Sequence, residues 1–127
     1  MELNQGRTIL SKNIIPYLIK LASYHGTTST GTVTEMIGLT EEIKGRTVVI
    51  VEDIVDTGIT LEKLVNLLTK KEVKQIKVAS FLLKPEAYKK DIKVDYVGME
   101  IPNAFVVGYG LDYDGLGRNM KEIFVLK

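Results

Sequence analysis

Cysteine and tryptophan are absent from this sequence of 127 residues, and histidine occurs only once. Without cysteine the protein has no disulfide, no thiolate nucleophile and no zinc–thiolate site. The 17 lysines and arginines nearly balance the 16 acidic residues, so a net charge of +1 gives no strong field that would attract nucleic acid or an acidic membrane. No apolar run approaches the length of a membrane span, and no signal peptide is visible. We therefore expect a cytoplasmic protein whose partners include neither nucleic acid nor membrane.

The most informative stretch is residues 47–60, with the sequence TVVIVEDIVDTGIT. Its first five residues are all β-branched, which predicts a short strand buried on both faces, as in a parallel sheet covered by helices. Glu52, Asp53 and Asp56 follow directly. Carboxylates after a buried strand are costly unless they meet cations, hydroxyls or water, so these three are candidate site residues.

The same stretch ends in a small, hydroxylated turn, residues 57–60 (TGIT), just before an amphipathic helix. A glycine turn at a helix N-terminus presents free backbone N–H groups and the positive end of the helix dipole to an anion. The turn matches neither the Walker pattern nor the G-x-G-x-x-G pattern of dinucleotide-binding proteins. Acids that suit hydroxyls, a metal or a proton, placed beside a phosphate cradle, together suggest a phosphorylated sugar as the ligand.

A helix is predicted after this turn because four apolar residues recur at helical spacing: Leu61, Leu64, Val65 and Leu68. The helix lies between the apolar segments 47–51 and 76–83, and this order predicts a βαβ unit with parallel strands. Further short strands are expected in the ranges 14–22, 33–38, 95–99, 104–107 and 123–126. The expected fold class is therefore α/β, a parallel sheet flanked by helices in a single domain.

Ligands of parallel sheets bind beyond the carboxyl ends of the strands. The acidic loop 52–60, Lys84 after the 76–83 strand and the glycine-rich segment 108–117 all follow expected strand ends, so they can converge on one cleft. Residues 23–34 are rich in glycine, serine and threonine, which predicts a long loop. Loops of that length in small domains are often lids.

Each remaining candidate also has an ordinary structural explanation. Lys84 at a strand end is more often a solvated lysine, and Phe105 is more often a core residue than a platform for a ligand. Asp112 and Arg118 suit an ordinary surface pair. His25, which lies in the predicted lid, is more often an exposed bystander than a catalytic base.

Taken together, these segments resemble the type I phosphoribosyltransferases, specifically the hypoxanthine-guanine phosphoribosyltransferase family. VVIVEDIVDTGIT resembles that family's motif for phosphoribosyl pyrophosphate (PRPP), and LASYHGTTSTG resembles its flexible catalytic loop. KVASFLLKP, IPNAFVVGYGLDY and GRN resemble its purine and pyrophosphate segments in the same order. The resemblance covers residues 17–127 as one domain with a C-terminal purine-binding hood, whereas residues 1–16 form a non-matching arm. The family's first strand, pyrophosphate loop and helix have no counterpart there, so the chain looks N-terminally shortened.

The resemblance implies Mg²⁺-dependent purine salvage, in which 5-phosphoribosyl passes from PRPP to hypoxanthine or guanine and gives IMP or GMP plus pyrophosphate. It implies that Glu52 and Asp53 hold the ribose hydroxyls and bind magnesium, and that Asp56 acts as general base or acid at purine N7. Ser23 and Tyr24 would close over the reacting centre and exclude water. The 5′-phosphate would be bound by the backbone and hydroxyls of Asp56, Thr57, Gly58, Ile59 and Thr60.

The resemblance also implies roles for residues of the hood. Lys84 would donate a hydrogen bond to the purine 6-oxo oxygen, Phe105 would stack on the base, and the backbone of Val106 would read its edge. Asp112 would lie at the purine site as a second magnesium ligand, and Arg118 would contact pyrophosphate. A homo-oligomer, either a dimer or a tetramer, is expected on the same grounds.

Other kinds of protein remain open at this point. One is a truncated, inactive fragment that still binds nucleotide, and another is a non-catalytic regulator that senses PRPP or nucleotide on the same fold. A regulator would be expected to carry a basic nucleic-acid surface or an added domain, against which the net charge and the short chain argue. The uracil, orotate, adenine and xanthine phosphoribosyltransferases share the fold. Lys84 and the IPNAFVVGYGLDY segment favour 6-oxopurines without deciding between hypoxanthine, guanine and xanthine.

Overall fold

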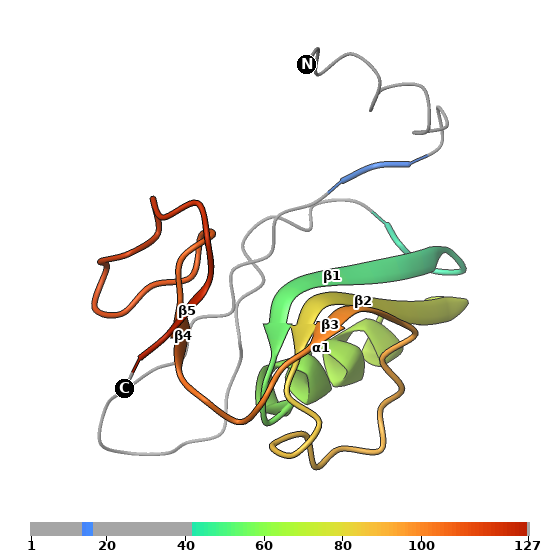
Figure 1. The fold of residues 1–127 in the computed structure, drawn as a ribbon. Coiled ribbons are helices and arrows are strands. Elements are labelled where there is room, and N and C mark those ends of the chain that lie inside the picture. Colours follow the sequence, from blue (N-terminus) through green and yellow to red (C-terminus); the bar gives the residue numbers. More distant parts are fainter. Residues whose placement is uncertain (1–13, 17–41, 127) are drawn as a thin grey trace, which may run out of the picture. The chain divides into compact units, whose positions relative to one another are not determined.

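The computed structural model describes residues 14–16 and 42–126. Contacts divide the chain into two units, Met1–Glu42 and Ile43–Lys127, and nearly all of the described residues belong to the second. Its elements in order are shown in Figure 1: β1 (Thr47–Val55), α1 (Ile59–Lys70), β2 (Gln75–Leu83), β3 (Tyr96–Glu100), β4 (Val106–Val107) and β5 (Phe124–Val125). The strands expected at 14–22 and 33–38 lie outside the described residues, apart from 14–16, which have no regular secondary structure. The predicted domain boundary between residues 16 and 17 stays a prediction.

β1, β2 and β3 form a parallel sheet in that order. β1 and β2 pair along their whole length, from Thr47 opposite Gln75 to Val55 opposite Leu83. Because α1 connects these two parallel neighbours, the predicted βαβ unit and the α/β fold class are confirmed. Within residues 42–126, β1 is an edge strand that pairs on one side only.

α1 covers one face of this sheet, as Figure 1 shows, through the apolar stripe expected from leucine spacing. Burial of the 47–51 strand on both faces, which the sequence predicted, is not found within residues 42–126: Ile50 is buried against α1, whereas Val49 and Val51 on the other face are exposed. The buried core combines leucines of α1 with sheet residues that alternate with more exposed ones: Leu61, Leu64, Leu68, Ile50, Val78 and Leu82. Full burial of one such side chain contributes about 1.5–3 kcal/mol before conformational entropy is counted. The core therefore holds α1 against the sheet, which sets the position of the short turn between β1 and α1. Among the described residues, no helix is long and apolar enough to cross a membrane.

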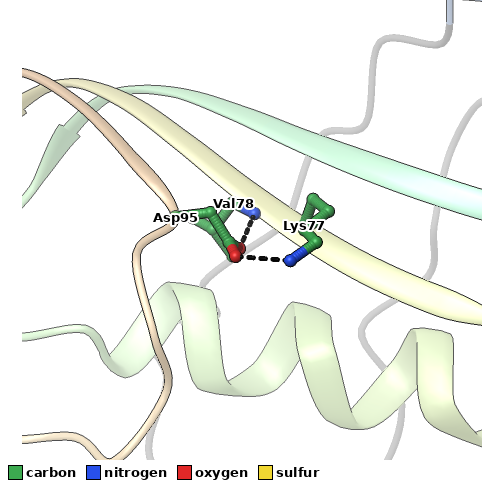
Figure 2. A network of polar contacts seen from close by, with 3 residues as sticks. All are labelled: Lys77, Val78 and Asp95. Atoms are coloured by element: carbon green, nitrogen blue, oxygen red, sulfur yellow. Dashed lines mark hydrogen bonds and ion pairs between the residues drawn. The ribbon is translucent and has the colours of Figure 1, made fainter.

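A polar network fastens the beginning of β3 to the middle of β2 (Figure 2). The carboxylate of Asp95 accepts a hydrogen bond from the backbone N–H of Val78 at 2.9 Å and one from Lys77 Nζ at 2.7 Å. The backbone N–H of Asp95 donates in turn to the carbonyl of Val78 at 2.8 Å. The hydrogen bond from Lys77, followed by that from Val78, lowers the pKa of Asp95, and the same lysine bond raises the pKa of Lys77.

The C-terminal part is a small hood built on the antiparallel pair β4 and β5. Both strands are shorter than the predicted ranges 104–107 and 123–126. The glycine-rich segment between them is a series of turns, as expected, closed by bridges from Gly108 to Leu111 and from Tyr113 to Leu116. Gly108 has a φ of 99°, and a Cβ there would lie 2.0 Å from the carbonyl oxygen of Glu122, so only glycine fits.

Candidate active site

The acids of the 47–60 stretch do not all lie in a loop, contrary to expectation. β1 continues to Val55, because Ile54 and Val55 remain paired with β2 and extend the strand past its first two carboxylates. Glu52 and Asp53 therefore belong to the end of the strand, and both line the cavity described below. Asp56 is the first residue beyond the strand.

Glu52 lies partly buried beside a second negative charge. Burial, and then the charge of Asp53, raise the pKa of Glu52 above its ordinary value. Asp53 accepts a hydrogen bond from the backbone N–H of Ile54, 2.8 Å from its Oδ1. Within residues 42–126, no lysine or arginine pairs with either carboxylate. Two adjacent carboxylates that lack a cation suit Mg²⁺ or sugar hydroxyls, because both bind well to carboxylate oxygens.

The turn that follows forms a cavity of about 250 Å³, lined by residues 52–61. Gly58 is the N-cap of α1, its φ of 81° is in the left-handed region, and no side chain caps the helix. The first backbone N–H groups of α1 consequently have no capping side chain to satisfy them. Thr57 and Thr60 are exposed beside them. These N–H groups, the hydroxyls and the positive helix end make the cavity suitable for a phosphate.

Lys84 follows β2 directly and is buried, so the alternative of a solvated lysine does not hold. Its backbone N–H donates to the carbonyl of Val55 at 3.0 Å, which places it beside the end of β1. Its Nζ lies 2.6 Å from Oδ2 of Asp56, one of the residues that line the cavity. The structure therefore brings together the predicted general base and the predicted purine-selecting cation.

In the hood, Phe105 is half exposed, so the alternative of a core residue does not hold, whereas Val106 is buried. The ring of Tyr113 packs edge-on against Phe105, with centroids 5.6 Å apart and an interplanar angle of 87°. This contact limits the orientations open to the Phe105 ring while leaving much of it accessible. Tyr113 was not singled out from the sequence, and its place in the LDYDG segment gives no periodic signal that would have identified it.

Asp112 and Arg118 form the surface pair that the sequence suggested, with Oδ1 and Nη2 2.8 Å apart. Asp112 also accepts a hydrogen bond from the backbone N–H of Gly115 at 2.7 Å. The negative charge of Asp112 is therefore already paired with Arg118 and the backbone of Gly115 within the hood. In the described part of the chain, no three His, Cys, Asp or Glu side chains come together as metal ligands, so Glu52, Asp53 and Asp112 do not form one cluster.

Three other residues considered from the sequence, Ser23, Tyr24 and His25, lie outside the described residues. Two residues near the cavity could not be identified from the sequence. Tyr88 packs against Gly58, and Lys90 forms an ion pair of 2.7 Å with Glu62 in the first turn of α1. The KPEAYKK sequence offered only a mixed polar loop, so neither contact had a local signal.

Comparison with known proteins places this site in a family. The model of the phosphoribosyl transferase domain matches residues 13–114. The hypoxanthine-guanine phosphoribosyltransferase of Bacillus subtilis is 46% identical over 123 residues, which are 93% of this chain and 68% of that protein.

Solved structures of the same family are also similar to this chain. A hypoxanthine phosphoribosyltransferase from Staphylococcus aureus superposes with a TM-score of 0.74 and 44% identity, over 87% of this chain and 61% of that one. The HGPRT-ase from Leishmania tarentolae in complex with GMP gives a TM-score of 0.68 and 37% identity, over 74% of this chain and 55% of that one. The chain thus spans only part of the length of each of these proteins. With a family model that matches most of its residues, it belongs to the phosphoribosyl transferase domain family and, within it, to the hypoxanthine-guanine phosphoribosyltransferases.

Proposed function

We propose that this chain carries the nucleotide-binding part of an Mg²⁺-dependent hypoxanthine-guanine phosphoribosyltransferase that acts in purine salvage. In the proposed reaction, the bond from ribose C1′ to pyrophosphate breaks, a bond from C1′ to purine N9 forms, and the purine loses a proton. The observation that carries the proposal is the Lys84–Asp56 pair beside an uncapped helix N-terminus, since it joins a base-recognition group, a proton acceptor and a phosphate site. The names of the relatives support it.

The sugar and phosphate would occupy the cavity of residues 52–61. The turn 57–60 would bind the 5′-phosphate, while Glu52 and Asp53 would accept hydrogen bonds from the ribose hydroxyls. The same two carboxylates would hold Mg²⁺ together with oxygens of the substrate, and the ion would offset the negative charge of the departing pyrophosphate. Their negative charge would also favour a ribose that becomes positively charged at C1′.

The base would be recognised where Asp56 and Lys84 meet. Asp56 would accept the proton that the purine loses at N7, as general base. Lys84 would donate to the 6-oxo oxygen, whereas adenine offers an amino group to which an ammonium cannot donate. Because the two side chains pair with each other in this structure, a bound 6-oxopurine would have to share or replace that contact.

The hood would complete the site. Phe105, held edge-on by Tyr113, would stack on the base, and the backbone of Val106 would contact its edge. Arg118 would contact pyrophosphate, for which it would exchange its present partner Asp112. The lid roles of Ser23 and Tyr24, a cytoplasmic location and a homo-oligomer, dimer or tetramer, stay predictions from the resemblance.

The experiment that tests the proposal is product formation by the full chain with PRPP, Mg²⁺ and either hypoxanthine or guanine, followed by absorbance. The expected result is IMP or GMP formation that requires Mg²⁺, with no AMP formed when adenine replaces the 6-oxopurine. Absence of turnover together with a GMP-dependent rise in melting temperature would restrict the proposal to nucleotide binding. Absence of both would overturn it.

A further inference from the structure

Gly58 has a neighbour that leaves it no room for a side chain. A Cβ on Gly58 would lie 2.4 Å from Cε2 and 2.9 Å from Cδ2 of Tyr88, and 2.9 Å from Cγ of Lys90. The aromatic ring therefore occupies the space beside the N-cap of α1. Since Gly58 adopts a φ of 81°, its conformation is open to glycine and costly for most other residues. The ring therefore packs against Gly58, at the position in the cavity turn where the backbone conformation favours glycine.

Tyr88 is itself held firmly. Its backbone N–H donates to the carbonyl of Lys84 at 3.0 Å, in a turn that begins directly after β2. Its hydroxyl donates to the carbonyl of Ile92, so both ends of the residue are fastened. Burial, followed by the charges of Asp91 and Glu62, raises the pKa of Tyr88, and the phenol accordingly remains protonated and able to donate.

A second contact ties the same segment to the helix. Lys90 Nζ lies 2.7 Å from Oε2 of Glu62, and the lysine side chain is only 27% exposed. The segment from Lys84 to Ile92 thus leaves the end of β2, passes the N-terminus of α1 and is fixed there by a ring and an ion pair. It connects the purine-selecting lysine to the phosphate turn within a few residues.

We propose that Tyr88 is a positioning residue for the phosphate site, acting through Gly58. Its ring fills the space beside the glycine and restricts the turn 57–60 to the conformation in which the N–H groups of α1 face the cavity. Without the ring, the glycine would have more conformations to lose on binding, because glycine is the least restricted residue. Phosphate affinity would fall, whereas affinity for the base and ribose would not. The inference rests on the proposed function, since it concerns the same phosphate site.

The test compares GMP with guanosine, which lacks the phosphate, by isothermal titration calorimetry on the full chain. Wild type is expected to bind GMP more tightly than guanosine. Tyr88→Leu is expected to weaken GMP binding by about tenfold, which corresponds to about 1.4 kcal/mol, while guanosine binding stays within about twofold. Tyr88→Phe keeps the ring and is expected to retain the wild-type ratio. Lys89→Ala, an exposed neighbour on the same segment, is the matched control.

The possible failures are distinguishable. If wild type binds GMP no better than guanosine, the phosphate site fails, and the proposed function fails with it. If wild type prefers GMP and Tyr88→Leu keeps the same preference, only the role of Tyr88 is overturned. An equal loss for both ligands would also overturn it, because that result indicates general damage. Tyr88→Met, which fills similar volume with a flexible chain, replaces Tyr88→Leu if melting curves show that the leucine variant does not fold.

Discussion

Lys84 and Asp56 approach to 2.6 Å, yet the lysine side chain is 7% exposed and the aspartate side chain is 45% exposed. The two partners therefore depend on each other unequally. A buried ammonium that loses its carboxylate has little water to replace it, whereas a half-exposed carboxylate that loses its ammonium can be solvated. The pair is also long-range, since its members are 28 residues apart in the sequence.

This inequality predicts an asymmetric effect on stability. Asp56→Ala leaves the buried ammonium unpaired and is expected to lower the free energy of unfolding by about 1–3 kcal/mol. Lys84→Met keeps the packing volume and leaves an aspartate that water can reach, so we expect a smaller loss. Urea unfolding of the two variants measures the difference. A larger loss for Lys84→Met would contradict the burial difference as its cause.

Asp56→Asn separates proton transfer from pairing. The asparagine amide can still accept a hydrogen bond from Lys84, but it cannot take up a proton at neutral pH. We expect turnover to fall by roughly 10²–10⁴, the usual contribution of a general base, while GMP affinity stays close to wild type. Steady-state kinetics and titration calorimetry measure the two effects, with Asp114→Asn as the control. Near-normal turnover would remove Asp56 from the role of base.

Lys84→Met tests base selection. Methionine approximates the lysine stem but cannot donate to a 6-oxo oxygen, so the preference for guanine over adenine is expected to fall by about tenfold or more, the equivalent of one hydrogen bond. Competition between the two bases in the product assay measures it. Lys89→Met, which changes an exposed lysine nearby, should leave the preference unchanged. An unaltered preference in Lys84→Met would make Lys84 a structural residue only.

The Asp95 network predicts a dependence of stability on pH. Because the pKa of Asp95 is lowered in the folded state, its contribution is fully present above the ordinary value of about 4 and is lost as pH falls through the lowered value. Lys77, whose pKa is raised, contributes below about pH 10.4 and loses its contribution as pH rises through its higher folded value. Asp95→Asn should therefore have a lower melting temperature than wild type at about pH 7, and the difference between the two melting temperatures should shrink as the pH falls. Asp91→Asn is the control. A difference in melting temperature between Asp95→Asn and wild type that does not change with pH would contradict the ionic explanation.

Glu52→Gln is expected to stabilise the unliganded protein. A raised pKa means that the folded protein holds this proton more tightly than the unfolded chain, so ionised Glu52 reduces stability above its ordinary pKa of about 4.3. Removing the charge should raise the melting temperature by roughly 1–4 °C at neutral pH and weaken PRPP binding in the presence of Mg²⁺. Calorimetric melting with and without ligand measures both. A lower melting temperature without ligand would indicate that Glu52 has a stabilising partner.

Elements with a local cause could be predicted from the sequence. The β-branched run gave β1, leucine spacing gave α1, and the small turn before it gave the uncapped helix end. The end of β1 could not be predicted, because the acids indicated a loop and only the pairing of Ile54 and Val55 with β2 keeps the strand going. Tertiary pairing overrode the local signal there.

The site was less predictable than the fold for a similar reason. Glu52, Asp56 and Gly58 lie in one informative stretch, so they could be identified together. The burial of Lys84 depends on the carboxylate of Asp56, which is far away in the chain. The contact of Tyr88 with Gly58 joins the loop that follows β2 to the loop that follows β1. Nothing in the residues adjacent to Lys84 or Tyr88 encodes these contacts.

Within the described part of the chain β1 is an edge strand, and its sequence bears on how such an edge meets another molecule. An unpaired edge can recruit the same strand of another molecule, and uncharged β-branched segments are the ones that assemble in this way. Within residues 42–126 the edge of β1 presents such a segment at 47–51, bounded by Arg46 on one side and by Glu52 and Asp53 on the other. The charges at its ends oppose the stacking of identical strands. The carboxylates proposed to bind sugar and metal would thus also limit edge-to-edge pairing of this segment, and Glu52→Gln would weaken that protection while it raises the melting temperature.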